Sequence, residues 1–349
     1  MTPLHRPALQ GGLLALGAAL LFGISTPMVQ AAGQGLGAFS TASLLYAGAA
    51  LLGALLRQPV EREARLQRTD GSRLFGMALF GAVIGPVCLA WGLQHTSGTS
   101  ASLMLTLEAV FTAILARLLY REVMDRKVWA AMALLTGGGA LLVVEGHQTG
   151  QAQFLGILAV MAATTAWGVD NTLSRPLADR DPGQVVLAKS ALGASFTALL
   201  AWMAHESAPT ALQAAALLAI GATGYGLSLR LYLLAQRSFG AARTGSVFAF
   251  APFIGALFAM GLQDRSITWG VVAGGLLMLL GIALHLSESH AHEHQHDALL
   301  HEHAHTHDDG HHNHLHDPMP QGAHSHMHSH EPMRHTHPHA PDLHHAHHH

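Results

Sequence analysis

The stretch SASLMLTLEAVFTAILARLLYREVMDRKVWAAMALLTGGGALLVV, residues 100–144, decides the fold class. It holds most of two apolar runs, at about 98–119 and 128–145, with a short charged turn between them. Each run approaches the roughly 20 apolar residues that an α-helix needs to cross a bilayer. Glu108 and Arg117 are the only Asp, Glu, Lys or Arg residues between positions 74 and 119. A water-facing surface of this length would need more charged residues. The two apolar runs are therefore expected to be membrane-spanning helices.

The rest of the chain has the same character. Of its 349 residues 50% are hydrophobic and 11% are charged, whereas soluble domains carry about 25% charged residues. The 37 glycines suit close helix–helix contacts in lipid. Ten candidate spans follow from the apolar runs: about 9–29, 36–56, 74–94, 98–119, 128–145, 154–174, 184–203, 211–235, 241–262 and 268–286.

Two short matches indicate an internal duplication. FGIS at residues 22–25 aligns with WGVD at 167–170, an offset of 145. LEAVF at 107–111 aligns with FAPFI at 250–254, an offset of 143. The similar offsets predict a repeated unit of five helices, and an odd number of helices inserts the second copy upside down. Inverted repeats recur in secondary transporters, with the substrate site between the halves.

Loop charges predict the orientation. With the N-terminus in the cytoplasm, the inner segments hold 14 of the 18 Lys and Arg residues, and the outer loops hold Arg265 alone. Short cytoplasmic loops are enriched in Lys and Arg. Both termini are therefore expected in the cytoplasm, with the chain in a bacterial inner membrane.

Residues 100–144 and their counterpart RTGSVFAFAPFIGALFAMGLQDRSITWGVVAGGLLMLLGIAL, residues 243–284, resemble the EamA family of the drug/metabolite transporter superfamily. Each stretch has a small-residue-rich helix, an acidic–basic turn and a Gly-rich helix. Glu122 stands where the family often has Glu, and Pro252 fits a common proline that Ala109 replaces in the first copy. The resemblance covers about residues 10–287. It implies ten spans and carriage of small solutes, often coupled to an ion gradient, and leaves the solute open.

The expected fold is therefore an all-α integral membrane protein of ten transmembrane helices, arranged as two inverted five-helix repeats. The first EamA-like repeat would cover residues 1–146, the second 147–287, and a disordered His-rich cytoplasmic tail 288–349.

Glu108 is the first candidate for transport chemistry. A carboxylate in the middle of a span is costly, so it normally faces the interior of the bundle. There it could exchange protons or ligate a cation. In a continuous helix it would share a face with Met104 and Thr112. The alternative is a protonated residue that only holds helices together.

Further polar candidates lie in other spans. Asp170 and Asn171 of the sixth span could bind a solute, or Asp170 could pair with Lys189. Lys189, like Arg117 and Arg230, lies toward the cytoplasmic end of its span, where a long stem can reach the interface. His95 ends the third span and is either a ligand or an interfacial residue.

The tail predicts metal binding. Residues 290–349 contain 24 of the 29 histidines, mostly in alternation with other residues. Imidazole binds Zn, Ni, Co and Cu, and His-rich tracts are typical of metal binding. Several weak, interchangeable sites are expected rather than one closed site. The candidate ligands are His290, His292, His294, His296, His301, His303, His305, His307, His311, His312, His314, His316, His324, His326, His328 and His330.

Three functions remain open on the sequence. One is a secondary transporter that exports divalent Ni, Co or Zn collected by the tail. The second is an exporter of a small organic metabolite or drug, with the tail as a metal or proton buffer. The third is a membrane-embedded metal sensor or store without transport.

An enzyme is not expected, because the chain has neither a P-loop motif nor a Ser/His/Asp arrangement in a water-accessible region. No resident cofactor is required beyond metal ions on the tail. The expected partners are the bilayer, the small-molecule or metal-ion substrate and a second copy of the chain, but no nucleic acid.

Overall fold

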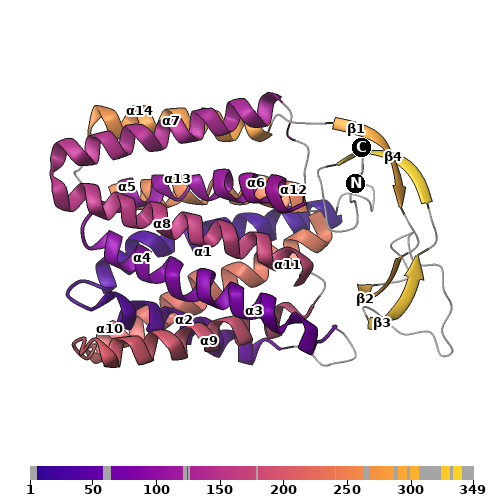
Figure 1. Ribbon diagram of the computed structural model, residues 1–349, viewed down its shortest axis with the longest axis horizontal. Coiled ribbons are helices and arrows are strands. Elements are labelled where there is room, and N and C mark those ends of the chain that lie inside the picture. The colour runs from indigo at the N-terminus through magenta and orange to yellow at the C-terminus, as the bar shows by residue number, and fades with distance from the viewer. Residues whose placement is uncertain are drawn as a thin grey trace.

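The computed structural model is a bundle of long helices that run along one direction (Figure 1). It describes residues 6–57, 64–120, 124, 126–177, 180–239, 241–262, 264 and 267–286, with four stretches of the tail at 290–296, 299–305, 324–330 and 333–339.

Five spans in the first half are built from nine helical elements. They are α1 (Arg6–Ala32), α2 (Ala38–Leu55), η2 (Arg68–Asp70), α3 (Gly71–Met77), η3 (Ala78–Ile84), α4 (Gly85–Leu93), α5 (Gly98–Met104), α6 (Leu107–Tyr120) and α7 (Arg126–Thr149), followed by α8 (Gln151–Ser174), which opens the second half. The second half continues with η4 (Arg175–Leu177), α9 (Pro182–Met203), α10 (Ala211–Ile220), η5 (Gly221–Leu227), α11 (Ser228–Phe239), α12 (Ala241–Phe248), α13 (Ala251–Gly261) and α14 (Trp269–Leu286).

The described residues contain nine segments long and apolar enough to cross a membrane. They agree with the first nine spans expected from the sequence. Within the same residues Trp269–His285 is a shorter apolar helix, and it lies against α7 along one edge of the bundle (Figure 1). The all-helical membrane fold is thus established for the described body, while the count of ten spans stays a prediction.

The two halves share irregularities at matching positions. The π-helical segments η3 and η5 begin at Ala78 and Gly221, 143 positions apart. The fourth span is interrupted between α5 and α6, after Met104, and the ninth between α12 and α13, after Phe248. The interruptions support the duplication that the sequence matches indicate.

Helix packing follows the same duplication. α1 lies against α11 and α13, and its counterpart α8 lies against α4 and α6. α2 packs along α9, and α7 packs along α14. Each of the last two contacts joins equivalent helices of the two halves. The centre of the bundle, between α1 and α8, is therefore the place where both halves contribute side chains.

Backbone caps from distant helices tie the end of the bundle opposite the tail. The Glu206 carboxylate accepts hydrogen bonds from the backbone N–H groups of Phe39 (3.1 Å) and Ser40 (2.7 Å), which begin α2. His205 adopts a positive φ of 52° just before it, where the chain turns out of α9. Asp264 accepts from the N–H of Thr99 (2.8 Å), at the start of α5.

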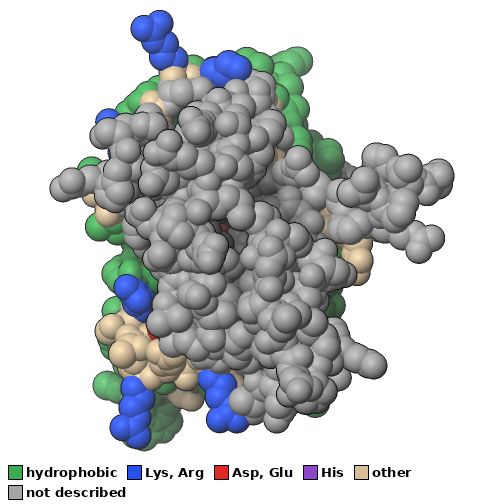
Figure 2. Space-filling model, turned by 90° about the vertical axis from the view of Figure 1, so that its right-hand side faces the viewer, with side chains coloured by type: hydrophobic (Ala, Val, Ile, Leu, Met, Phe, Trp, Pro, Cys, Tyr) green, Lys and Arg blue, Asp and Glu red, His purple; other side chains and the backbone are tan. Residues whose placement is uncertain are grey.

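The other end carries Lys and Arg side chains around its rim, with apolar side chains along the flanks behind them (Figure 2). There Arg180 pairs with Asp70, Nε to Oδ2 at 3.0 Å. The tail strands lie beyond this end (Figure 1).

The tail contains two antiparallel strand pairs. β1 (His290–His296) pairs with β4 (Met333–His339), and β2 (Leu299–His305) pairs with β3 (His324–His330). Alternation at every second residue fits the two-residue repeat of a strand. The disorder expected of the free tail stays a prediction.

Candidate functional site

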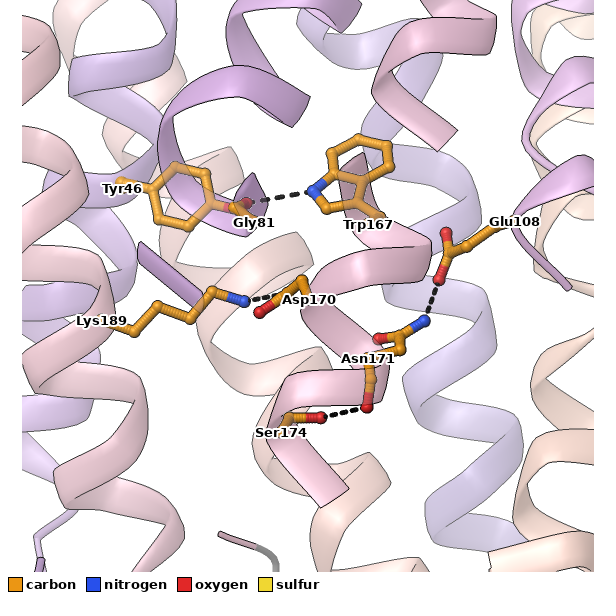
Figure 3. A network of polar contacts seen from close by, with 8 residues as sticks. All are labelled: Tyr46, Gly81, Glu108, Trp167, Asp170, Asn171, Ser174 and Lys189. Atoms are coloured by element: carbon orange, nitrogen blue, oxygen red, sulfur yellow. Dashed lines mark hydrogen bonds and ion pairs between the residues drawn. The ribbon is translucent and has the colours of Figure 1, made fainter. Parts of the chain in front are cut away.

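The site is built around the backbone carbonyl of Gly81, in the π-helical segment η3. A π-helical turn disturbs the regular i→i−4 hydrogen bonds, and such segments often lie at functional sites. The Gly81 oxygen accepts a hydrogen bond from Trp167 Nε1 at 3.0 Å and another from the Tyr46 hydroxyl. Residues of α2, η3 and α8 thereby meet at one atom (Figure 3).

Glycine is required at position 81 because of Asp170. A Cβ built on Gly81 would lie 2.2 Å from Asp170 Oδ2 and 2.3 Å from its Cγ. The absence of a side chain lets the carboxylate approach the widened turn. Trp167 and Asp170 are three residues apart on α8, so both point to the same side of that helix.

Asp170 forms an ion pair with Lys189 of α9, between Oδ2 and Nζ. Each residue is 6% exposed. The pairing considered from the sequence is confirmed, and the alternative that the Lys189 stem reaches the membrane interface is wrong. The physical reason is that Asp170 needs a partner. A buried charge left alone costs several kcal/mol, so the Lys189 ammonium group is more stable beside the carboxylate than at the membrane interface. Asp170 Oδ1 has no hydrogen-bond partner among the described residues.

Glu108 lies in the first turn of α6, directly after the interruption of the fourth span. Its Oε1 accepts a hydrogen bond of 2.6 Å from Asn171 Nδ2 (Figure 3). The start of a helix carries partial positive charge, which favours a carboxylate there. Glu108 is half-buried and Asn171 is exposed, so this pair can be reached from outside the packed core.

The interruption changes one expectation. Met104 is fully buried in α5, while Glu108 and Thr112 lie on α6. The predicted shared face of Met104, Glu108 and Thr112 assumed a continuous helix, and with the interruption after Met104 it stays a prediction. Thr112 does remain near the site. A Cβ on Gly168 of α8 would lie 3.2 Å from its backbone nitrogen, and its hydroxyl has no partner within the described chain.

An aromatic cluster adjoins the polar groups. Phe22 meets Trp167 edge to face with ring centroids 6.2 Å apart, and Tyr225 at 6.0 Å. Tyr46 lies 5.6 Å from Tyr225. Sequence analysis did not identify Tyr46, Gly81, Phe22 or Trp167 as site residues. The signal for two of them was present, since Phe22 and Trp167 are the first aligned residues of the repeat.

His95 lies apart from this network. It stacks on Trp91 with ring centroids 4.0 Å apart, and its Nδ1 is 2.8 Å from the Trp91 carbonyl oxygen. Fourteen residues of span separate it from Gly81, about 20 Å along a helix. This position favours the interfacial alternative over a ligand role.

Arg230 and Arg117, unlike Lys189, make contacts near the ends of their spans. Arg230 donates from Nη1 to the Leu56 carbonyl at 2.9 Å, at the end of α2. Arg117 is exposed and its guanidinium carbon lies 5.9 Å from the centre of the Trp129 ring. Both contacts are at helix ends, as expected for side chains that reach the interface.

The candidate metal ligands divide into two groups. Those on the tail strands β1, β2 and β3 are His290, His292, His294, His296, His301, His303, His305, His324, His326, His328 and His330. His307, His311, His312, His314 and His316 lie outside the described residues. In the part of the chain whose side chains are described, no three His, Cys, Asp or Glu residues are grouped to hold a metal ion.

Apolar helices of this length around a polar centre define a multi-pass membrane protein. A sequence model of the EamA-like transporter family matches residues 9–144 and 154–287. The chain belongs to this family, and the two matches cover its two repeats.

Relatives point to transport. An "Uncharacterized transporter" of Methanothermobacter thermautotrophicus is 31% identical over 231 residues, 64% of this chain and 66% of that protein. The "Riboflavin transporter ImpX" of Fusobacterium nucleatum is 36% identical over 98 residues, 26% of this chain and 31% of that protein. The chain thus spans less than two thirds of the length of each. A solved structure described as "Crystal structure of protein" matches with a TM-score of 0.56 at 17% identity, over 78% of this chain and 94% of that one. This last likeness concerns the fold alone.

Proposed function

We propose that the protein is a secondary transporter that exports a small organic solute across the bacterial inner membrane. Its ten spans form two inverted five-helix repeats, 1–146 and 147–287, with both termini in the cytoplasm. The shared offset of the π-helical segments supports the repeats. The Lys and Arg rim at the tail end supports the orientation (Figure 2).

The network around Gly81 carries this proposal. It takes Tyr46, Gly81 and Glu108 from the first repeat, and Asp170 and Lys189 from the second. Inverted-repeat carriers bind their solutes at such an interface and expose it alternately to each side as the halves rock. Buried ionisable groups within a membrane are costly and mark transport pathways.

The side chains of the site favour an organic solute. Aromatic rings from α1, α2, α8 and η5 lie beside two carboxylates, an ammonium group and an amide. Apolar walls with a few oriented polar groups are typical of sites for small organic molecules. Under this proposal the tail buffers metal ions or protons.

A growth panel tests the proposal. Cells with the full-length protein, with its Asp170→Asn variant or with an empty vector would meet toxic aromatic amines, antibiotics and salts of Ni, Co, Zn and Cu. The protein should raise the tolerated concentration of at least one organic compound, and Asp170→Asn should remove that gain at equal abundance in the membrane. No gain for any compound would contradict export.

Divalent metal export is the second candidate, and the histidine-rich tail favours it. The tail would raise the local concentration of metal near the inner mouth, and the body would carry it. In the same panel this function predicts tolerance to metal salts alone. That gain should shrink, and need higher metal, when residues 290–349 are removed.

A further inference from the structure

Asp170 is the least satisfied group of the central site. Its Oδ2 contacts Lys189 Nζ, but its Oδ1 has no partner among the described residues, although the residue is 6% exposed. A buried carboxylate oxygen without a hydrogen bond is costly. A second donor is therefore missing from this side of the carboxylate.

Lys189 is under-satisfied as well. An ammonium group has three N–H donors, and the acceptor that the described part of the chain offers it is Asp170 Oδ2. Asp170 and Lys189 come from neighbouring helices, α8 and α9, and no backbone link fixes the pair. The Lys189 ammonium group thus contacts one oxygen of the Asp170 carboxylate, and the other oxygen can accept a hydrogen bond from a second ammonium group.

A second carboxyl group lies beside the ion pair. Glu108 accepts its hydrogen bond from Asn171, the neighbour of Asp170 on α8, and this donor is neutral. The site therefore holds two carboxyl groups and one ammonium group. A further cation can bind there without an excess of positive charge.

The neighbouring groups fit a cation with an apolar body. Trp167 lies on the same side of α8 as Asp170, and its ring meets Phe22. Tryptophan faces attract ammonium groups more strongly than other aromatic rings do. The exposed Asn171 and half-buried Glu108 lie next to the pair on α8 and α6, on the accessible side of the network.

We propose that the site recognises solutes that carry a protonated amine, and that Lys189 is an internal substitute for this amine in the empty protein. The solute ammonium group binds Asp170, first at the unpartnered Oδ1, and competes with Lys189 Nζ. This inference rests on the proposed transport function and specifies its substrate class. At Asp170 the positive charge of the solute, more than its shape, then determines which solutes bind.

Four probes with one ring and different head groups test the charge rule on the wild-type protein. They are benzylamine, benzyltrimethylammonium, benzyl alcohol and benzoate, titrated by calorimetry at neutral pH into the full-length protein in lipid nanodiscs. Benzylamine should bind most tightly, roughly tenfold or more above benzyl alcohol, because a charge-assisted hydrogen bond is added. Benzyltrimethylammonium, which has no N–H donor, should fall between them, and benzoate should bind weakest.

Variants test the role of Lys189. Lys189→Met removes the competitor and should tighten benzylamine binding by roughly tenfold, a gain that a purely structural lysine would not produce. Lys189→Arg keeps the competing charge and should leave the affinity near that of the wild type. Asp170→Asn should abolish the preference for amines. Gly137→Ala, where a Cβ meets nothing within 4 Å, controls for substitution in a span.

The outcomes separate this inference from transport itself. Tightest binding of benzoate, equal binding of amine and benzoate, or binding of no probe would overturn the amine rule. If Lys189→Met does not fold, the wild-type ranking alone still decides. Counterflow of radiolabelled benzylamine and benzoate in proteoliposomes measures transport separately from binding. Counterflow of benzoate that requires Lys189 would keep the transporter and reject the amine rule.

Discussion

Phe22 and Trp167 occupy equivalent positions of the two repeats, and their rings meet edge to face with centroids 6.2 Å apart. The first residues of the FGIS and WGVD matches are therefore in contact at the centre of the bundle. Duplicated helices that face each other across an internal axis bring matching positions together there. From these rings outward the halves differ, since Ser25 of the first corresponds to Asp170 of the second.

Replacement of Glu108 tests its role in transport. Glu108→Gln keeps the size and a hydrogen-bonding oxygen but removes the ionisable group. We expect transport of the exported solute to fall by roughly tenfold or more, with abundance in the membrane near normal. Glu145→Gln, near the far end of α7, is the matched control. Normal transport in Glu108→Gln would return Glu108 to a packing role, and a parallel loss of abundance would show that it holds helices together.

Gly81→Ala tests the close approach of Asp170 to η3. The added Cβ would lie 2.2 Å from Asp170 Oδ2, so the carboxylate or the helix must move, at a cost of about 1–3 kcal/mol. The thermal midpoint in detergent should fall and transport should be lost. Gly137→Ala provides the comparison, because its added methyl group meets open space and alanine favours a helix. Equal midpoints for the two variants would contradict the contact.

Glu206 should hold the start of α2. Glu206→Ala removes the acceptor for the N–H groups of Phe39 and Ser40, and loss of a helix cap costs about 1 kcal/mol. Glu206→Gln retains one amide oxygen and should lose less. Thermal unfolding of the purified variants measures both effects. If alanine and glutamine behave alike, the cap contributes nothing measurable.

Fusions test the topology. Reporters placed after residue 65 and at the C-terminus should both read cytoplasmic, because 14 of the 18 Lys and Arg residues fall on that side. A periplasmic C-terminus would be incompatible with an even number of spans and with a cytoplasmic tail.

Deletion of residues 290–349 tests the tail. High-capacity Ni or Zn binding should disappear, while the helical body stays folded, because its described apolar core is formed by residues of the helical bundle. Binding to the full-length protein should weaken steeply below about pH 6, since imidazole has a reference pKa of about 6.5 and its protonated form cannot ligate a metal. Equilibrium dialysis across pH measures both. If both forms give no metal resistance at any concentration, metal export fails, and the organic carrier or a metal store without transport remains.

Hydrophobicity was enough to predict nine of the spans, because lipid imposes one requirement on every residue that faces it. The pairing of Asp170 with Lys189 was open to prediction for a related reason, since two opposite charges at one depth rarely stay apart in a membrane. The local backbone geometry could not be predicted from the sequence. The π-helical turn at Gly81 and the interruption after Met104 depend on close contacts between helices, and periodicity along one helix does not record them. For that reason the partners of the Gly81 carbonyl, Tyr46 and Trp167, were missed.

The two π-helical segments also carry information about descent. Ala78–Ile84 and Gly221–Leu227 begin 143 positions apart and have equal length, so one event before the duplication accounts for both more simply than two events after it. The ancestral single unit, when it paired with a second copy of itself, then already had the widened turn at the contact. Present-day relatives with only one five-helix unit are expected to have a π-helical segment at the corresponding depth of their third helix, which a solved structure of such a relative would reveal.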